Sequence, residues 1–468
     1  MLLVDLMIVQ VALPTIHREV GGSFTDLQWV IDAYALTLAA SILMFGSIAD
    51  RVGRKRVFIA GVTVFTSASL LCGAANGIEF LIAGRALQGL GGAAMFATGL
   101  ALIGQEFQGR ERGRAIALWG ATVGFAAAVG PLAGGCLTDA FGWRWIFLIN
   151  GPIGVATVAV ALWQMVNVSD TCARRLDWAG LVTFSGSLFA AMLGLMRGSD
   201  LGWGSRPIVA LFAGSALLMA AFIAIELRQS RPMLDLSLFR NPAFVGVSIA
   251  TLAIGLGLFA VFPYITLFLQ NGLGYSPLAA GLILLPATIP CFVVPLATRS
   301  WAERLSPGLV LGAGLATSAA GLAVMHALTA DRIWTTLVPG LLLSGIGIGI
   351  ANPAIAKTAL GVVPPQRAGM ASGISNTFRI GGLATGVAAL GVVFEHHLTA
   401  SLGSRVASGE GDGLTPSHES FVSSIDLILV IGTVLVVVGA LAAVTLVRAR
   451  DFHRVTASQR PSLAPEPC

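Results

Sequence analysis

The chain has 468 residues, of which 56% are hydrophobic and 11% charged, and its mean hydropathy is +0.84. Soluble domains carry about a quarter of charged residues, so this composition excludes a soluble domain and predicts an integral membrane protein. The net charge of +5 comes with no basic patch interleaved with aromatic residues, which argues against nucleic-acid binding. The five cysteines are scattered without the spacing of a zinc site or a disulfide framework, and no metal is expected.

Apolar runs divide the chain into expected membrane-spanning helices. The first run, residues 1–16, would be only about 22–24 Å long, short of a bilayer core of ~30 Å. We therefore expect the true start to lie upstream, and the lack of a charged region followed by a cleavage site indicates an uncleaved first helix. Thirteen further helices are expected at 27–49, 57–75, 79–104, 114–138, 145–166, 177–197, 207–226, 243–270, 277–298, 308–329, 333–355, 367–394 and 423–447.

Basic residues orient these fourteen helices. Most of the 28 lysines and arginines fall in connections on the side where the second expected helix meets the third. Cytoplasmic loops of membrane proteins carry an excess of Lys and Arg. This side is therefore predicted to be cytoplasmic, and so are both termini.

The connection at residues 46–56, with the sequence GSIADRVGRKR, is more specific than a positive loop requires. An ordinary positive-inside loop needs neither the glycines nor a carboxylate at fixed places. The string resembles the G-x-L-A-D-R-x-G-R-[KR] signature of the major facilitator superfamily. The resemblance implies a conformational latch, in which Asp50 faces the start of a helix in the other half, near Arg367. The expected latch residues are Gly46, Asp50, Arg51, Gly53 and Arg54.

An internal repeat divides the chain into two halves. Ala49-Asp50-Arg51 recurs as Ala302-Glu303-Arg304, Ala60-Gly61 recurs as Ala313-Gly314, and in the next helix Gly91 recurs as Gly347. Parallel repeats of this kind build two equivalent bundles. We expect an all-α polytopic membrane protein of the major facilitator fold. Its parts would be a six-helix bundle at 1–166, two inserted linker helices at 177–227, a second six-helix bundle at 241–447 and a cytoplasmic tail at 448–468. The insertion resembles the fourteen-helix drug:proton antiporter branch of the superfamily.

The fifth expected helix contains the stretch GFAAAVGPLAGG. Its proline bends the helix, and its glycines let a neighbouring helix approach closely. Ordinary small-residue packing explains the glycines but not the Gly-Pro pair. The stretch resembles a motif shared by proton-coupled exporters, which implies export. The residues of this antiporter motif are Gly124, Gly130, Pro131, Gly134 and Gly135.

Three charged residues inside expected helices are candidates for proton coupling. Arg85 either faces a cavity and sets the proton affinity of a carboxylate or forms a structural salt bridge, because an unpaired guanidinium in the membrane is costly. Asp5 belongs to a stretch that resembles the first-helix signature of the antiporter branch, and it lies about 14 Å into the membrane. Asp32 is shallower and could be a water-exposed residue at the cavity mouth, so Asp5 is the preferred proton carrier.

Four residues are candidates for the substrate cavity: Gln10, Gln88, Asn376 and Arg379. Arg379 is expected near the midplane, where it binds an anionic part of the substrate or pairs with Asp5 across the two halves. Asn376 could instead hydrogen-bond within its own bundle.

Together these features predict proton-coupled efflux of small amphipathic drugs or antibiotics by alternating access. A proton-coupled importer, or an exporter of a specific endogenous metabolite, is the alternative. The sequence has neither a Walker A loop nor a metalloenzyme motif. We therefore expect a secondary transporter and not an enzyme, driven by the proton gradient without a cofactor. The expected partners are a small-molecule substrate, protons and the lipid bilayer, for a monomer in the inner (plasma) membrane of a bacterium.

Overall fold

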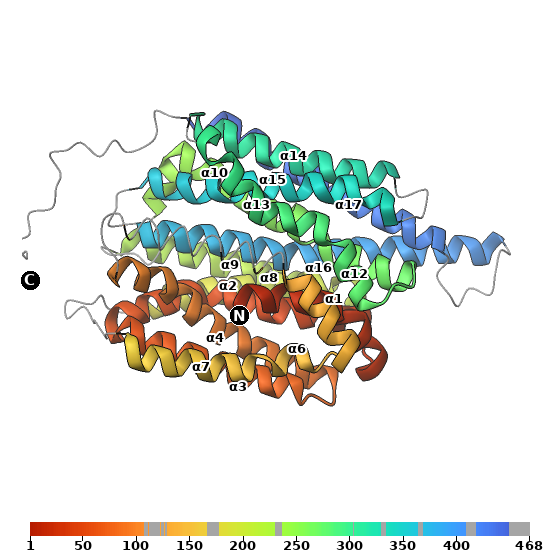
Figure 1. Ribbon diagram of the computed structural model, residues 1–468, viewed down its shortest axis with the longest axis horizontal. Helices are drawn as coiled ribbons and strands as arrows, with labels where there is room; N and C mark the ends of the chain where they lie inside the picture. Colours follow the sequence, from red (N-terminus) through yellow and green to blue (C-terminus); the bar gives the residue numbers. More distant parts are fainter. Residues whose placement is uncertain are drawn as a thin grey trace, which may run out of the picture.

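The computed structural model describes residues 1–106, 111, 122, 126, 129–165, 177–229, 236–302, 304–328, 334–363, 368–408 and 418–448. Every regular element in these ranges is a helix, and most helices lie side by side along the long axis of the molecule (Figure 1). Ten helical spans of the described residues are long and apolar enough to cross a membrane, or eleven if a bent pair is one span. The all-helical membrane architecture is confirmed, and the count of fourteen stays a prediction.

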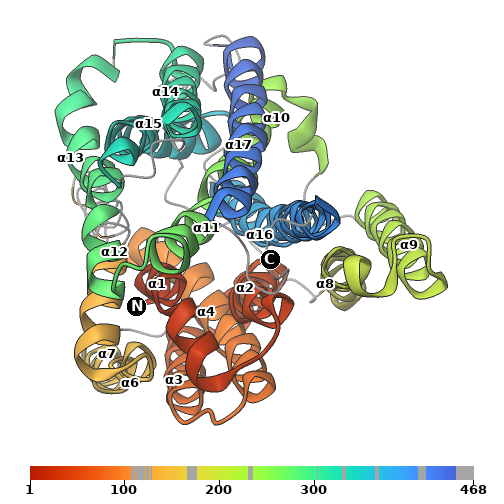
Figure 2. The same ribbon diagram turned by 90° about the vertical axis from the view of Figure 1, so that its right-hand side faces the viewer.

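The first half of the chain forms one group of helices, drawn in red to yellow (Figure 2). They are α1 (Leu2–Val20), α2 (Phe24–Val52), α3 (Arg54–Gly73), α4 (Ile78–Glu106), α6 (Trp145–Leu148) and α7 (Asn150–Gln164), with a further helical stretch at 129–141. α2 begins with a capping box, in which the Ser23 hydroxyl accepts from the Asp26 N–H and the Asp26 carboxylate accepts from the Ser23 N–H. These bonds satisfy free donors at the helix start, so the chain can reverse sharply after α1.

The second half forms the other group, drawn in green to blue (Figure 2). Its elements are the 3₁₀ helix η1 (Leu236–Arg240), α10 (Pro242–Ala253), the π-helix η2 (Ile254–Phe259), α11 (Phe262–Leu267), the π-helix η3 (Phe268–Gly272), α12 (Pro277–Ile283), α13 (Leu285–Ala302), α14 (Pro307–Leu328), α15 (Trp334–Gly361), α16 (Ala368–Ser408) and α17 (His418–Leu446). The two groups meet where α1 contacts α11 and α12, and where α2 and α4 contact α16. We call this contact the bundle interface.

The sequence repeat has a structural counterpart in each half. A Cβ atom on Gly61 of α3 would lie 3.0 Å from the carbonyl oxygen of Gly91 in α4. In the second half, a Cβ on Gly314 of α14 would lie 2.9 Å from the carbonyl oxygen of Gly347 in α15. The repeated glycines therefore occupy the same helix crossing in both halves, where only small residues let the backbones approach this closely.

Two helices between the halves, α8 (Trp178–Leu201) and α9 (Arg206–Arg228), form a pair beside the bundle interface (Figure 2). α8 contacts both α2 and α16. The pair is held together at Ser187 and Ser215, since each hydroxyl donates to the carbonyl oxygen of the other residue at 2.9 Å. Ser185 also donates to the carbonyl oxygen of Ala40 in α2 at 3.0 Å.

Several predicted helices differ from the observed ones in their boundaries or in their shape. The helix expected at 1–16 continues to Val20, because backbone hydrogen bonding does not stop where the apolar run meets charged residues. The helix expected at 367–394 extends to Ser408. The single helix expected at 243–270 contains two π-helical segments. The helix expected at 277–298 is bent by 41° between Ile283 and Leu285.

Candidate functional site

Asp5 of α1 is the centre of a buried polar network. Its Oδ2 atom accepts from Nη1 of Arg85 in α4 at 2.5 Å. Its Oδ1 atom accepts from Nε2 of Gln88 in α4 at 2.9 Å and from Nδ2 of Asn150 in α7 at 3.2 Å. Both side chains of the ion pair are at most 1% exposed. Such a pair is stable in a dry interior only when further hydrogen bonds satisfy the charges.

The guanidinium of Arg85 makes further contacts within the first half of the chain. Its Nε donates to the carbonyl oxygen of Val30 at 2.9 Å, and its Nη1 also donates to Oε1 of Gln88 at 2.8 Å. The ring of Tyr34 lies under the guanidinium carbon at 4.2 Å, a favourable cation–π arrangement. The sequence left two alternatives for Arg85, a cavity-facing residue or a structural salt bridge, and the structure shows its side chain buried and paired with Asp5.

Two residues of this network were not predicted. Asn150 begins α7 and donates from Nδ2 to Oγ of Ser69 in α3 at 3.0 Å, as well as to Asp5. Ser69 in turn donates to the carbonyl oxygen of Phe147 at 2.9 Å. Ser69 was not predicted because a serine hydroxyl in an apolar run usually forms its hydrogen bond within its own helix. The signal that could have found Asn150 was an amide inside an expected membrane helix.

Asp32 of α2 has quite different surroundings. Its side chain is wholly buried, at 0% exposure, so of the two alternatives for Asp32 the water-exposed residue does not match this conformation, and its role in proton coupling stays a prediction. Neither carboxyl oxygen has a hydrogen-bond partner in the part of the chain that the structure describes. Moving an ionised carboxylate into such a site without a partner would be very costly.

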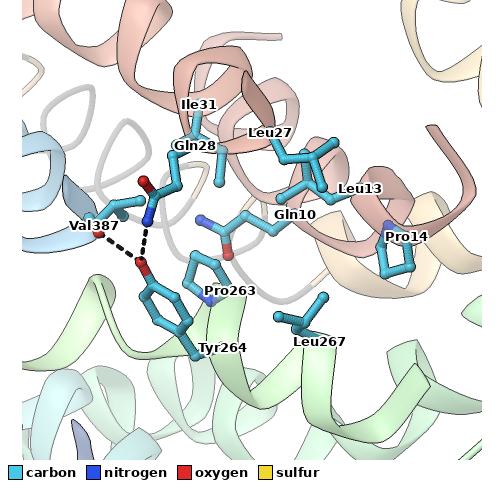
Figure 3. A pocket seen from close by; sticks show the side chains of 10 residues that line it. All are labelled: Gln10, Leu13, Pro14, Leu27, Gln28, Ile31, Pro263, Tyr264, Leu267 and Val387. Atoms are coloured by element: carbon cyan, nitrogen blue, oxygen red, sulfur yellow. Dashed lines mark hydrogen bonds between the residues drawn. The ribbon is translucent and has the colours of Figure 1, made fainter. Parts of the chain in front are cut away.

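The bundle interface contains polar contacts at the end where α1 connects to α2. Gln28 of α2 donates from Nε2 to the hydroxyl of Tyr264 in α11 at 3.1 Å, and this hydroxyl donates to the carbonyl oxygen of Val387 in α16 at 2.5 Å (Figure 3). Gln270 of η3 donates from Nε2 to the carbonyl oxygen of Val11 in α1 at 2.7 Å. The halves are therefore joined by hydrogen bonds at this end, which the sequence predicts to be the outer one.

The four predicted cavity residues are separated. Gln10 lines a small cavity at the bundle interface (Figure 3), whereas Gln88 is wholly buried in the network around Asp5. Arg379 donates to Oδ1 of Asn376, one turn before it in α16, at 2.5 Å. The suggested pairing of Arg379 with Asp5 was wrong, because Asp5 forms its ion pair with Arg85.

The glycines of the antiporter motif pack against the first helix. A Cβ on Gly130 would lie 2.6 Å from the Cβ of Met7, and one on Gly134 would lie 2.8 Å from the carbonyl oxygen of Ile8. Any larger residue would push α1 aside. Gly124 lies outside the described residues.

The same motif also crosses the bundle interface. A Cβ on Gly135 would lie 2.5 Å from the carbonyl oxygen of Pro277 in α12, and one on Gly281 would lie 2.6 Å from the carbonyl oxygen of Pro131. Reciprocal backbone contacts of this kind let the two halves touch without intervening side chains.

In the loop between α2 and α3, Gly53 has φ of 108°, a left-handed conformation that favours glycine. Lys55 donates from Nζ to the carbonyl oxygens of Leu162 and Met165 at 3.0 and 2.6 Å. It therefore binds the last free carbonyls of α7, an arrangement suited to a cation.

The remaining latch residues are only partly described. A Cβ on Gly46 would meet open space, and Arg51 is exposed. Arg54 begins α3. The side chain of Asp50 and all of Arg367 lie outside the described residues, so the latch stays a prediction.

Two groups of membrane-length helices that meet at a polar interface, one of them enclosing an ion pair, define a polytopic membrane protein. The sequence pattern of the Major Facilitator Superfamily matches residues 1–387, and the chain belongs to this family. It is thus a multi-pass membrane transporter and not an enzyme.

Relatives and a solved structure agree with this placement. The chain is 35% identical over 404 residues to the multidrug resistance protein Stp of Mycobacterium tuberculosis, covering 86% of this chain and 75% of that protein. It is 34% identical over 391 residues to the methylenomycin A resistance protein of Streptomyces coelicolor, covering 83% and 82%. A bacterial homolog of the human lysosomal transporter Spinster has a similar fold, with a TM-score of 0.64 and 17% identity over 97% of this chain and 96% of that chain.

Proposed function

We propose that this protein exports small amphipathic drugs or antibiotics in exchange for protons. The names of its relatives, a multidrug resistance protein and a methylenomycin A resistance protein, support drug export. The antiporter motif, whose glycines pack on α1 and α12, supports the same direction. We place the protein in the fourteen-helix branch, as a monomer in a bacterial inner membrane with both termini in the cytoplasm.

The observation that carries proton coupling is the wholly buried carboxyl of Asp32. A transported proton needs a site that holds it in one conformation and releases it in another. Asp32 has no described hydrogen-bond partner, so a bound proton would remove the cost of its burial, and access of water to it would allow release. Asp5, preferred from the sequence, is paired with Arg85 and remains the second candidate for the transported proton.

Purified protein in vesicles with an imposed pH gradient tests this function. We expect an inward proton gradient to drive an uncharged anthraquinone dye or ethidium out of the compartment that represents the cytoplasm, with saturation and with proton uptake. Transport in the opposite direction would show an importer. Transport that is indifferent to the pH gradient would rule out proton exchange.

A further inference from the structure

A small cavity lies within the bundle interface, and its walls come from both halves (Figure 3). Its volume is about 30 Å³, room for a water molecule or two. The residues that line it are Gln10, Leu13, Pro14, Leu27, Gln28, Ile31, Pro263, Tyr264, Leu267 and Val387. This set contains no charged side chain among the described residues, and most of it is apolar.

Gln10 is the distinctive group in this wall. Its side chain is 4% exposed, and its Nε2 atom has no hydrogen-bond partner within the described ranges. Figure 3 shows this amide nitrogen pointing into the space between Gln28 and Pro263. The Nε2 atom of Gln28, by contrast, is bonded to Tyr264. A buried donor without a partner is unfavourable and rare in native proteins, so one aimed into a cavity indicates a group that binds there.

The chemistry of the wall defines that group. An amide N–H donates, so the ligand atom that Gln10 binds is an acceptor such as a carbonyl, quinone or ether oxygen. The apolar side chains around it fit a hydrocarbon or aromatic body. Asp32 follows Ile31 in α2 but does not line the cavity, so the lining offers a cation no counter-charge.

We propose that Gln10 selects substrates by donating a hydrogen bond to an uncharged oxygen acceptor on an apolar, drug-sized molecule. This inference rests on the proposed function and names the substrate class of the exporter. Pockets for drug-sized ligands measure roughly 300–1,000 Å³, so the cavity must widen before such a substrate can enter. Separation of the halves at the Gln28–Tyr264 contact would open it.

Binding to purified protein tests the inference without any proton gradient. The probes are an uncharged anthraquinone, which carries carbonyl acceptors, and ethidium, a permanent cation without a carbonyl. For Gln10→Leu we expect the Kd for the anthraquinone to rise about tenfold, equivalent to ~1.4 kcal/mol, and the Kd for ethidium to change less than about twofold. Gln10→Asn keeps a donor and should restore part of the anthraquinone affinity.

Three results would overturn the inference: no binding of the anthraquinone to the unaltered protein, no change in its Kd for Gln10→Leu, or an equal rise for both probes. If Gln10→Leu does not fold, Gln10→Asn and Gln10→Glu decide the question. Asn should bind the anthraquinone better than Glu, which replaces the donor by an acceptor, and equal Kd values would contradict the role of Gln10. Failure of proton-driven transport with normal binding would instead count against the proposed function alone.

Discussion

Asp5 and Asp32 lie on neighbouring helices of the same half, and both are almost completely buried, yet their surroundings are opposite. Asp5 accepts hydrogen bonds from Arg85, Gln88 and Asn150. Asp32 has no described partner. Burial alone therefore does not determine the surroundings of an acid in this membrane protein. The two acids differ in the donors around them, and this difference is the basis of the proposal that Asp32 carries the proton.

The largest effect is expected when Asp32 is replaced by Asn, which keeps the shape of the side chain but cannot release a proton. Proton-driven efflux should fall to the level of empty vesicles, while the stability of the protein stays close to that of the original. Efflux at several imposed pH gradients and thermal unfolding in detergent would measure both. Normal proton-driven efflux by Asp32→Asn would remove the distinction between the two acids.

Arg85→Leu should act on folding. It leaves the carboxylate of Asp5 buried without its cation, and breaking a buried pair in this way costs ~3–5 kcal/mol. Thermal unfolding would measure the loss. The matched control is the double variant Asp5→Leu with Arg85→Leu, which removes both charges and should recover much of the stability. If the single variant is as stable as the original protein, Asp5 does not depend on Arg85 for its charge.

A smaller effect is expected for Asn150→Leu. It removes one of the donors to Asp5 but leaves Arg85, and a hydrogen bond to a charged group contributes ~1.5–3 kcal/mol. Thr157→Val, on the exposed side of the same helix, is the control and should change little. Equal unfolding temperatures for Asn150→Leu and Thr157→Val would show that Asn150 contributes nothing to holding Asp5.

The smallest effect concerns Asp50, a third acid that lies at the end of the helix carrying Asp32. If it faces the start of a helix in the other half, its charge gains ~0.3–1 kcal/mol there. Asp50→Asn should then slow transport by a factor of a few, keep substrate affinity, and increase the labelling of cysteines introduced at that end. Unchanged labelling, or loss of binding, would mean that this acid has no latch function.

The sequence by itself determined the class, the helical architecture and many of the residues that matter. Whether a segment enters the bilayer depends on its own hydropathy and charge. A run of about 20 apolar residues therefore predicts a membrane-spanning helix without knowledge of the helices that pack around it. The repeat likewise predicted two equivalent halves, and its glycines Gly61 and Gly314 occupy the same helix crossing in each half. Asp5, Asp32 and Arg85 were found because a charge in an apolar run is conspicuous.

Only the tertiary structure decided which residues meet. Asn150 reaches Asp5 from 145 positions away, and no local pattern encodes such a distance. The sequence suggested Arg379 as a possible partner of Asp5, but the packing of the helices brings Arg85 into the ion pair with Asp5. The π-helical segment η2 contains Gly255, where a Cβ would lie 2.8 Å from the backbone nitrogen of Leu383 in α16, so its backbone is fitted to another helix. The sequence left the exposure of Asp32 open for the same reason: depth along a helix can be counted from the sequence, but the surroundings of a side chain depend on helices that are remote in the chain.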